Sequence, residues 1–130
     1  MRETIVNMAK ILIIEDDLTM LRLLKTLMTI EGYQVLTATN ESTIFQTLSQ
    51  ETPDLILLDA HLRAADGTEI SGYEILEHIR RTPELRNTRV IMTSGIDLRE
   101  RALKAGADDF VLKPYIPDEL MDSIQAYLSE

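Results

Sequence analysis

Short apolar segments alternate with longer amphipathic segments along this chain. The segments at 11–14 and 55–58 are continuously apolar, a pattern typical of central parallel strands that are covered on both faces. An antiparallel sheet with one solvated face would show alternating polar and apolar residues instead. The strands predicted from this pattern span residues 10–15, 33–37, 54–59, 89–93 and 109–113.

A segment with the helical spacing of apolar residues follows each predicted strand. Asp17 and Asn40 can cap the first two helices, and Gly32 can end the first helix in a left-handed conformation. Ser71 and Glu74 are spaced as a capping box for the third helix. The predicted helices cover about 17–31, 40–50, 71–81, 97–105 and 117–128.

This alternation of strands and helices, with short connections, predicts an α/β fold with right-handed crossovers. We expect a three-layer, doubly wound domain in which a five-stranded parallel sheet lies between five helices. The length of 130 residues fits one domain. Residues 1–8 are interpreted as an N-terminal extension and residues 9–130 as the domain, because the first strand can begin naturally after Met8.

Composition excludes several classes of protein. The chain has no cysteine, so it holds no disulfide or thiolate metal site, and a cytoplasmic location is expected. Its net charge of −9 argues against direct binding of nucleic acid by this domain. No apolar stretch reaches the ~20 residues of a membrane span, so no membrane association is expected.

Acidic residues and a lysine lie at the ends of three predicted strands. Glu15 and Asp16 come at the end of the first strand, Asp59 ends the third and Lys113 ends the fifth. Ligands of open parallel sheets bind beyond the carboxyl ends of the strands, so these side chains are expected to form one site. Crowded carboxylates without sulfur ligands favour a hard cation such as Mg²⁺.

Asp59 is then placed to act as a nucleophile that forms an acyl phosphate. Lys113 and the hydroxyl of Ser94 could bond to the phosphoryl group. Each residue alone has an ordinary explanation: Asp16 as a helix cap, Asp59 and Ser94 as turn residues, and Lys113 as a surface lysine. Their joint occurrence at the ends of these strands makes coincidence a poor explanation.

Four motifs of this sequence resemble the receiver domains of two-component response regulators. They are KILIIEDD at 10–17, DLILLD at 54–59, VIMTSG at 90–95 and AGADDFVLKP at 105–114. The resemblance covers about residues 9–128. It implies a flavodoxin-like fold with strand order 2-1-3-4-5 and Mg²⁺-dependent transfer of a phosphoryl group from a sensor kinase histidine to Asp59.

The resemblance also implies a role for each site residue. The carboxylates of Asp16 and Asp59 and the backbone carbonyl of His61 would bind the metal directly, and Glu15 would act through water. Ser94 would be the hydroxyl and Phe110 the aromatic ring of a switch. Lys113 matches a phosphoryl-binding lysine, and its bond to Pro114 is expected to be cis.

Three features differ from the family pattern. Arg63 stands where members commonly carry a proline, four residues after the phosphoacceptor. The loop at 62–70 is longer than is common, and the segment 94–113 is shorter, which truncates the fourth helix. These differences flank the site, so they concern the signalling surface rather than the chemistry.

The leading hypothesis is a signalling switch that assists its own phosphorylation and dephosphorylation. Its expected partners are a sensor histidine kinase or a phosphotransfer protein, and an effector or output domain. A homodimer through the fourth helix, the fifth strand and the fifth helix is also open.

Two alternatives remain open. The first is a receiver that serves only as a phosphorylation-independent interaction module. The second is an aspartyl-phosphate hydrolase, which would carry an acid where His61 stands. A flavodoxin is disfavoured, because the acids at 15–17 would repel the phosphate of its flavin.

Overall fold

A computed structural model describes residues 9–63 and 67–129 of the chain. The expected extension 1–8 and residues 64–66 of the predicted long loop lie outside this range. Residues 10–112 contain a central sheet, all parallel, with the strands in the order β2 (Gln34–Ala38), β1 (Lys10–Ile14), β3 (Leu55–Asp59), β6 (Arg89–Ser94) and β7 (Asp109–Leu112).

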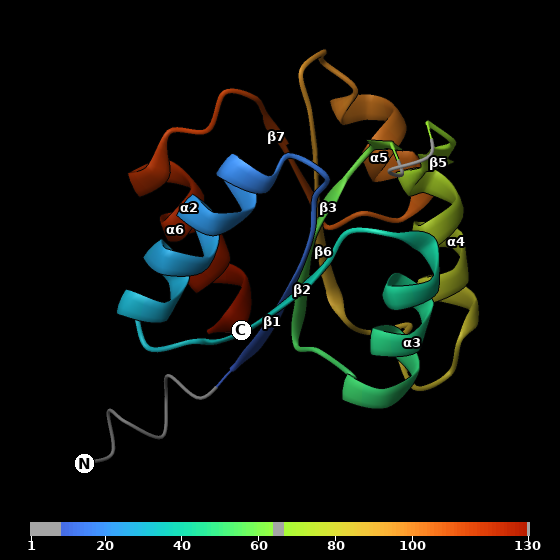
Figure 1. Ribbon diagram of the computed structural model, residues 1–130, viewed down its shortest axis with the longest axis horizontal. Helices are drawn as coiled ribbons and strands as arrows, with labels where there is room; N and C mark the ends of the chain where they lie inside the picture. The colour runs from blue at the N-terminus through green and yellow to red at the C-terminus, as the bar shows by residue number, and fades with distance from the viewer. Residues whose placement is uncertain (1–8, 64–66, 130) are drawn as a thin grey trace.

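Within the described residues five helices cover the sheet, and the fold predicted from the sequence is confirmed. The helices are α2 (Leu18–Ile30), α3 (Glu41–Glu51), α4 (Gly72–Arg81), α5 (Arg99–Ala105) and α6 (Pro117–Leu128). Figure 1 shows α2 and α6 on one face of the sheet and α3, α4 and α5 on the other. None of the helices in the described ranges is long and apolar enough to cross a membrane.

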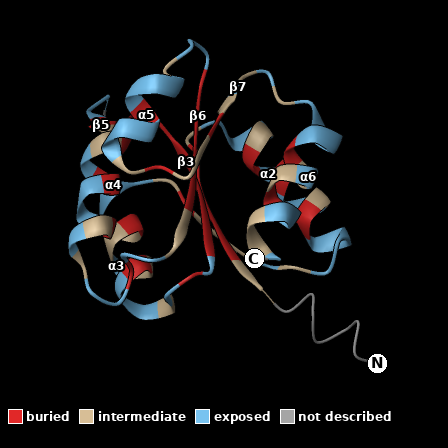
Figure 2. Ribbon diagram, turned by 180° about the vertical axis from the view of Figure 1, so that it is seen from behind, coloured by how far each residue is buried: buried red, intermediate tan, exposed pale blue. Residues whose placement is uncertain are grey.

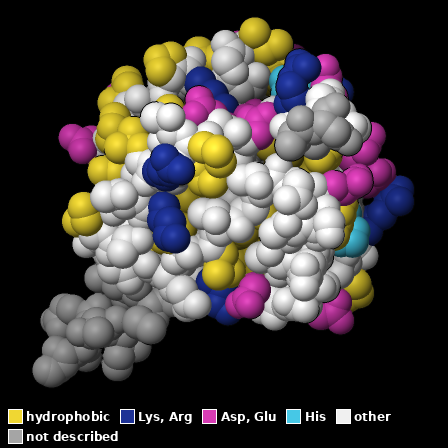
Figure 3. All heavy atoms as spheres, viewed as in Figure 1, with side chains coloured by type: hydrophobic (Ala, Val, Ile, Leu, Met, Phe, Trp, Pro, Cys, Tyr) yellow, Lys and Arg dark blue, Asp and Glu magenta, His cyan; other side chains and the backbone are white. Residues whose placement is uncertain are grey.

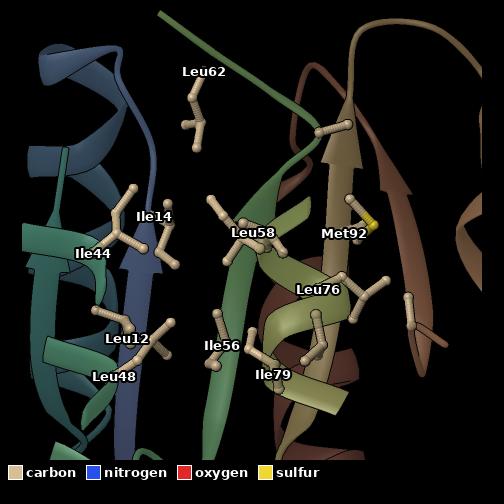
Figure 4. Close-up of a cluster of buried hydrophobic side chains, with 14 of the residues drawn as sticks. Leu12, Ile14, Ile44, Leu48, Ile56, Leu58, Leu62, Leu76, Ile79 and Met92 are labelled. Atoms are coloured by element: carbon tan, nitrogen blue, oxygen red, sulfur yellow. The ribbon is translucent and has the colours of Figure 1, made fainter. Parts of the chain in front are cut away.

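Buried apolar residues of the described ranges form two clusters, one on each face of the sheet. Leu12 and Ile56 point into the cluster under α3, α4 and α5, whereas Ile11 and Leu55 point into the cluster under α2 and α6, because successive strand residues alternate in direction. Figure 4 shows strand and helix side chains meeting in the first cluster. Buried residues follow the strands and the inner helix faces (Figure 2). This burial on both faces explains the continuous apolar runs.

Side-chain caps begin the first two helices as predicted. Asp17 accepts a hydrogen bond from the amide of Met20 (3.1 Å), and Asn40 accepts one from the amide of Thr43 (2.9 Å). These bonds satisfy amides that have no partner within a helix. Gly32 follows α2 with a φ of 97°, which is the left-handed conformation expected of it.

Only the serine half of the predicted capping box forms at the start of α4. The hydroxyl of Ser71 accepts a hydrogen bond from the amide of Tyr73 (3.2 Å). Ser71 also lies opposite His61 in a short antiparallel ladder, and the next amide, that of Gly72, donates to the carbonyl of Ala60 (2.8 Å). Within the described residues, the Ser71 amide makes no hydrogen bond to the Glu74 carboxylate.

The segment predicted as a long loop contains a hairpin, and the loop prediction was wrong for its described parts. β4 (His61–Arg63) pairs antiparallel with β5 (Glu69–Ser71). Leu62 lies opposite Ile70, and both side chains are buried. Three-residue strands are too short to reveal a period in the sequence, so the apolar pattern does not show them.

The helix predicted near Asp97 is short, as expected. α5 has seven residues, and Gly106 follows it with a φ of 113°. The carboxylate of Asp97 accepts a hydrogen bond from the amide of Arg99 (3.1 Å), the first residue of the helix. This helix therefore begins two residues later than the sequence pattern predicted.

Gly72, the first residue of α4, lies directly against the end of β3. Its amide donates to the carbonyl of Ala60 (2.8 Å). A Cβ atom at this position would overlap the carbonyl oxygen of Asp59 and would lie 2.9 Å from the Cα of Ala60. The helix therefore starts in backbone contact with the strand that carries Asp59.

Replacing Gly72 by alanine should lower the free energy of unfolding by about 1–3 kcal/mol, because neither backbone can readily retreat from the added methyl group. Gly95→Ala is the matched control, since a Cβ at Gly95 would meet no atom within 4 Å. Urea unfolding followed by circular dichroism measures both variants. Equal midpoints for Gly72→Ala and Gly95→Ala would contradict the close contact.

Candidate functional site

Three carboxylates meet at the carboxyl edge of the sheet, as the sequence predicted. Glu15 and Asp16 follow β1, and Asp59 ends β3, the strand beside it. One carboxylate oxygen from each lies within 4.8 Å of the others. Glu15 is only 1% exposed and Asp59 6% exposed. Figure 3 shows acidic side chains at the upper edge of the molecule, above the ends of the strands.

Lys113 supplies the positive charge that opposes these acids. Its Nζ lies 2.8 Å from Oδ2 of Asp59 and 3.1 Å from Oε1 of Glu15. Burial lowers the pKa of Lys113, but the hydrogen bond to Asp59 and the nearby negative charges outweigh burial and hold that pKa above its ordinary value. Burial raises the pKa of Glu15, and the charge of Lys113 opposes that rise.

Backbone amides hold the three carboxylates in orientation. The amide of Asp17 donates to Glu15 (3.2 Å), and that of His61 donates to Asp59 (3.1 Å). The amide of Arg63 donates to Asp16. Residues two apart on a strand point their amides to the same side. The edge of β4 away from β5 therefore faces the three carboxylates of Glu15, Asp16 and Asp59, which together form the acid pocket. The carbonyl of His61, a metal ligand expected from the resemblance, shares that side.

Ser94 and Phe110 lie on β6 and β7, the two strands that follow β3 in the sheet order. Ser94 ends β6, next to β3, and its buried hydroxyl accepts a hydrogen bond from the amide of Ile96 (3.2 Å). Phe110 is buried in the cluster under α3, α4 and α5. Arg99 of α5 donates to the carbonyl of Phe110 (2.8 Å), and its guanidinium lies 6.0 Å from the ring centroid. The structure therefore joins the acids and Lys113 directly. Ser94 is linked to this group by its carbonyl, which accepts a hydrogen bond from the amide of Lys113 (2.8 Å), and Phe110 lies on β7, three residues before Lys113.

Sequence reasoning missed two residues that contact the pocket. The hydroxyl of Tyr115 lies 3.2 Å from Oγ1 of Thr93 and 3.5 Å from Oε1 of Glu15. Burial raises the pKa of Tyr115, and the charges of Glu15 and Asp59 raise it further. A threonine at the end of an apolar strand was the available signal, but such threonines are common in strands.

The donor set of the pocket fits a hard divalent cation. Three carboxylates and a nearby backbone carbonyl offer oxygen ligands only, which Mg²⁺ and Ca²⁺ prefer. A cation of this kind would also relieve the repulsion between acids that are crowded and partly buried. The acidic triad is therefore able to bind a metal.

A model of the response regulator receiver domain matches residues 11–125 of this chain. The chain belongs to the response regulator receiver domain family. As a receiver domain it is a module of two-component signalling rather than a classical enzyme. The peptide bond between Lys113 and Pro114 is cis, as the resemblance led us to expect.

Curated relatives of this receiver domain include transcriptional regulators. The probable transcriptional regulator ycf27 of Pyropia yezoensis is 32% identical over 119 residues, which are 92% of this chain and 47% of that protein. The transcriptional regulatory protein KdpE of Mycobacterium tuberculosis is 31% identical over 121 residues, or 92% of this chain and 50% of that protein. The chain thus spans about half the length of the curated relatives it matches.

Solved structures share the fold of this receiver domain. A putative response regulator from Chloroflexus aurantiacus superposes with a TM-score of 0.84 at 26% identity, covering 95% of this chain and 99% of that one. The receiver domain of the Pseudomonas aeruginosa sensor histidine kinase PA1611 has a TM-score of 0.82 at 23% identity, with coverage of 95% and 99%. That protein holds a magnesium ion in its active-site cleft.

Removing the lysine should destabilise the metal-free domain more than removing the acid. Lys113→Met leaves two buried carboxylates without a cation, so the free energy of unfolding should fall by about 2–4 kcal/mol, slightly below the range for fully buried pairs. Asp59→Asn leaves Lys113 paired with Glu15 and relieves repulsion, so that variant should be at least as stable as the parent. Urea unfolding in chelator measures both changes. A Lys113→Met variant as stable as the parent would contradict this assignment of charge.

Proposed function

We propose that this receiver domain accepts a phosphoryl group on Asp59 from a histidine of a sensor kinase or a phosphotransfer protein. One observation carries the proposal: the Asp59 carboxylate is buried among acids that can hold a metal and lies 2.8 Å from Lys113. An aspartate that served only as a turn residue would need neither burial nor a cationic partner. The cytoplasm is the proposed location, as the absence of cysteine led us to expect.

In the proposed reaction a carboxylate oxygen of Asp59 attacks phosphorus as the bond between phosphorus and the donor histidine breaks. The bonding electrons return to the histidine nitrogen, which takes a proton from water. Lys113 moves from Asp59 to a phosphoryl oxygen, where it offsets charge in the transition state. A Mg²⁺ ion held by Asp16, Asp59 and the carbonyl of His61, with Glu15 acting through water, would neutralise further phosphoryl charge. The same groups would then assist hydrolysis of the acyl phosphate.

The proposed switch moves the signal from Asp59 to α5, β7 and α6. Ser94 leaves the amide of Ile96 to bond the phosphoryl group, and Phe110 rotates into the vacated space. The two states differ in the packing of these side chains, and the charge of the phosphoryl group shifts the equilibrium between them. Arg99 contacts the Phe110 backbone and approaches its ring, so a rotation of the ring reaches α5 directly.

The face formed by α5, β7 and α6 has the character of a docking surface. It contains a groove of 510 Å³ between β7 and α6. Exposed apolar side chains, Leu112 and Ile116, lie along the groove. The first turn of α6 is acidic, whereas α5 carries three basic residues and one acidic residue. The acidic start of α6 and the basic α5 carry opposite charges, which favours an effector, an output domain or a second copy of the chain as the partner. The relatives named as transcriptional regulators favour an output in transcription.

Phosphorylation of Asp59 can be tested without a cognate kinase. Incubation with acetyl phosphate and Mg²⁺ should add the mass of a single phosphoryl group, and alkali should release it, because acyl phosphates are labile. Asp59→Asn should take up none, and chelation of Mg²⁺ should prevent uptake by the parent. Intact mass spectrometry measures all three. Uptake by Asp59→Asn would refute the phosphoacceptor assignment, and steady turnover of other phosphoesters would favour a hydrolase.

Transmission of the signal can be tested by hydrogen exchange. Beryllofluoride mimics the acyl phosphate, and with Mg²⁺ it should slow amide exchange across residues 96–105, because the short helix α5 should become more ordered on activation. Asp59→Asn treated in the same way should show no change. Protection confined to the segments holding Asp16 and Asp59 would mean that the mimic is bound but the switch does not respond.

A further inference from the structure

A buried hydroxyl lies beside the acid pocket on β6. Thr93 has no exposed surface, and the residues before it, Ile91 and Met92, are aliphatic and equally buried. A buried hydroxyl is costly unless it is hydrogen-bonded. Its partner is the hydroxyl of Tyr115, 3.2 Å away. The position therefore holds a polar pair at a place where a valine would fill similar space.

The same tyrosine hydroxyl also approaches Glu15. The ring of Tyr115 packs against the cluster under α2 and α6, and its oxygen lies 3.5 Å from Oε1 of Glu15. A tyrosine hydroxyl has one proton but can also accept a hydrogen bond. If Thr93 donates to Tyr115, the tyrosine proton is free for Glu15.

Glu15 needs this donor most when Lys113 is occupied elsewhere. Lys113 is shared between Glu15 and Asp59 in the present structure. In the proposed function, Lys113 turns toward a phosphoryl oxygen on Asp59. Glu15, at 1% exposure, then keeps the amide of Asp17 and the hydroxyl of Tyr115 as its donors within the described residues.

We propose that Tyr115 is a positioning residue for Glu15. Anchored by Thr93, its hydroxyl orients the Glu15 carboxylate toward a metal-bound water and holds it there after Lys113 has moved to the phosphoryl group. Tyr115 thereby strengthens binding of Mg²⁺ and of a phosphoryl mimic. This role rests on the proposed function of the pocket.

The test removes one oxygen atom and measures binding of the metal alone. Tyr115→Phe should raise the Kd for Mg²⁺ by about threefold to tenfold. A strong hydrogen bond to a charged group would have an effect at least as large, but a contact of 3.5 Å is long for a hydrogen bond. Titration with MgCl₂, followed through the backbone amide NMR signals of Asp17 and His61, gives the Kd. The concentration of beryllofluoride needed for half saturation, in saturating Mg²⁺, should rise by a larger factor, because Lys113 is then engaged.

Matched variants separate positioning from general loss of structure. Tyr33→Phe removes the hydroxyl of another half-buried tyrosine packed against the same cluster, and it should leave both measurements unchanged. Thr93→Val should weaken Mg²⁺ binding less than Tyr115→Phe, and the double variant should be no weaker than Tyr115→Phe alone. That non-additivity is the signature of two groups that act as one unit. In chelator, the urea midpoint of the double variant, which leaves neither buried hydroxyl without its partner, should match that of the parent.

The outcomes distinguish this inference from the function on which it rests. Asp16→Asn is the reference variant, and it should nearly abolish Mg²⁺ binding. If Asp16→Asn does so while Tyr115→Phe binds like the parent, the positioning role is overturned and the proposed function stands. A lower urea midpoint of the double variant in chelator would also overturn it, because the pair of hydroxyls would then be structural. If Asp16→Asn binds Mg²⁺ normally, both assignments fail.

Discussion

The attraction of one lysine for two buried carboxylates holds the functional edge of this receiver domain together. Glu15 and Asp59 end up side by side because β1 and β3 are neighbours in the sheet, and alone they would repel each other. Lys113 reaches them from the end of β7, across β6. The pocket therefore depends on the sheet order, since only this order brings three distant parts of the sequence within reach of one ammonium group.

The sequence predicted the sheet and the acid cluster for physical reasons that are local. Strands buried on both faces must be continuously apolar, as at 11–14 and 55–58. Parallel strands end at one edge, so the acids that follow them had to meet. The first and last residues of the strands were predicted less accurately, because the apolar pattern does not separate the end of a strand from the polar turn beside it. The second strand begins at Gln34 rather than Tyr33, and the fifth ends at Leu112 rather than Lys113.

What the sequence did not reveal depends on contacts between distant residues. Thr93 and Tyr115 are separated by 22 positions, and their hydrogen bond needs both the neighbouring strands and the reach of a tyrosine. The hairpin of β4 and β5 depends on Leu62 and Ile70 being buried together, which a pattern of three residues cannot indicate. The predicted capping box forms only in part: Ser71 accepts a hydrogen bond from the amide of Tyr73, but within the described residues Glu74 makes no return bond to the Ser71 amide.

The free edge of β4 has a consequence for the behaviour of the protein in concentrated solution. An exposed strand edge offers unpaired amides to the strands of other molecules and invites aggregation. Here the two outward amides of β4 already donate to Asp59 and Asp16, and both acceptors are carboxylates. An approaching strand would have to displace these acids and bring its own carbonyl oxygens up to them. The acids that make the pocket chemically useful therefore also close this edge to intermolecular strand pairing.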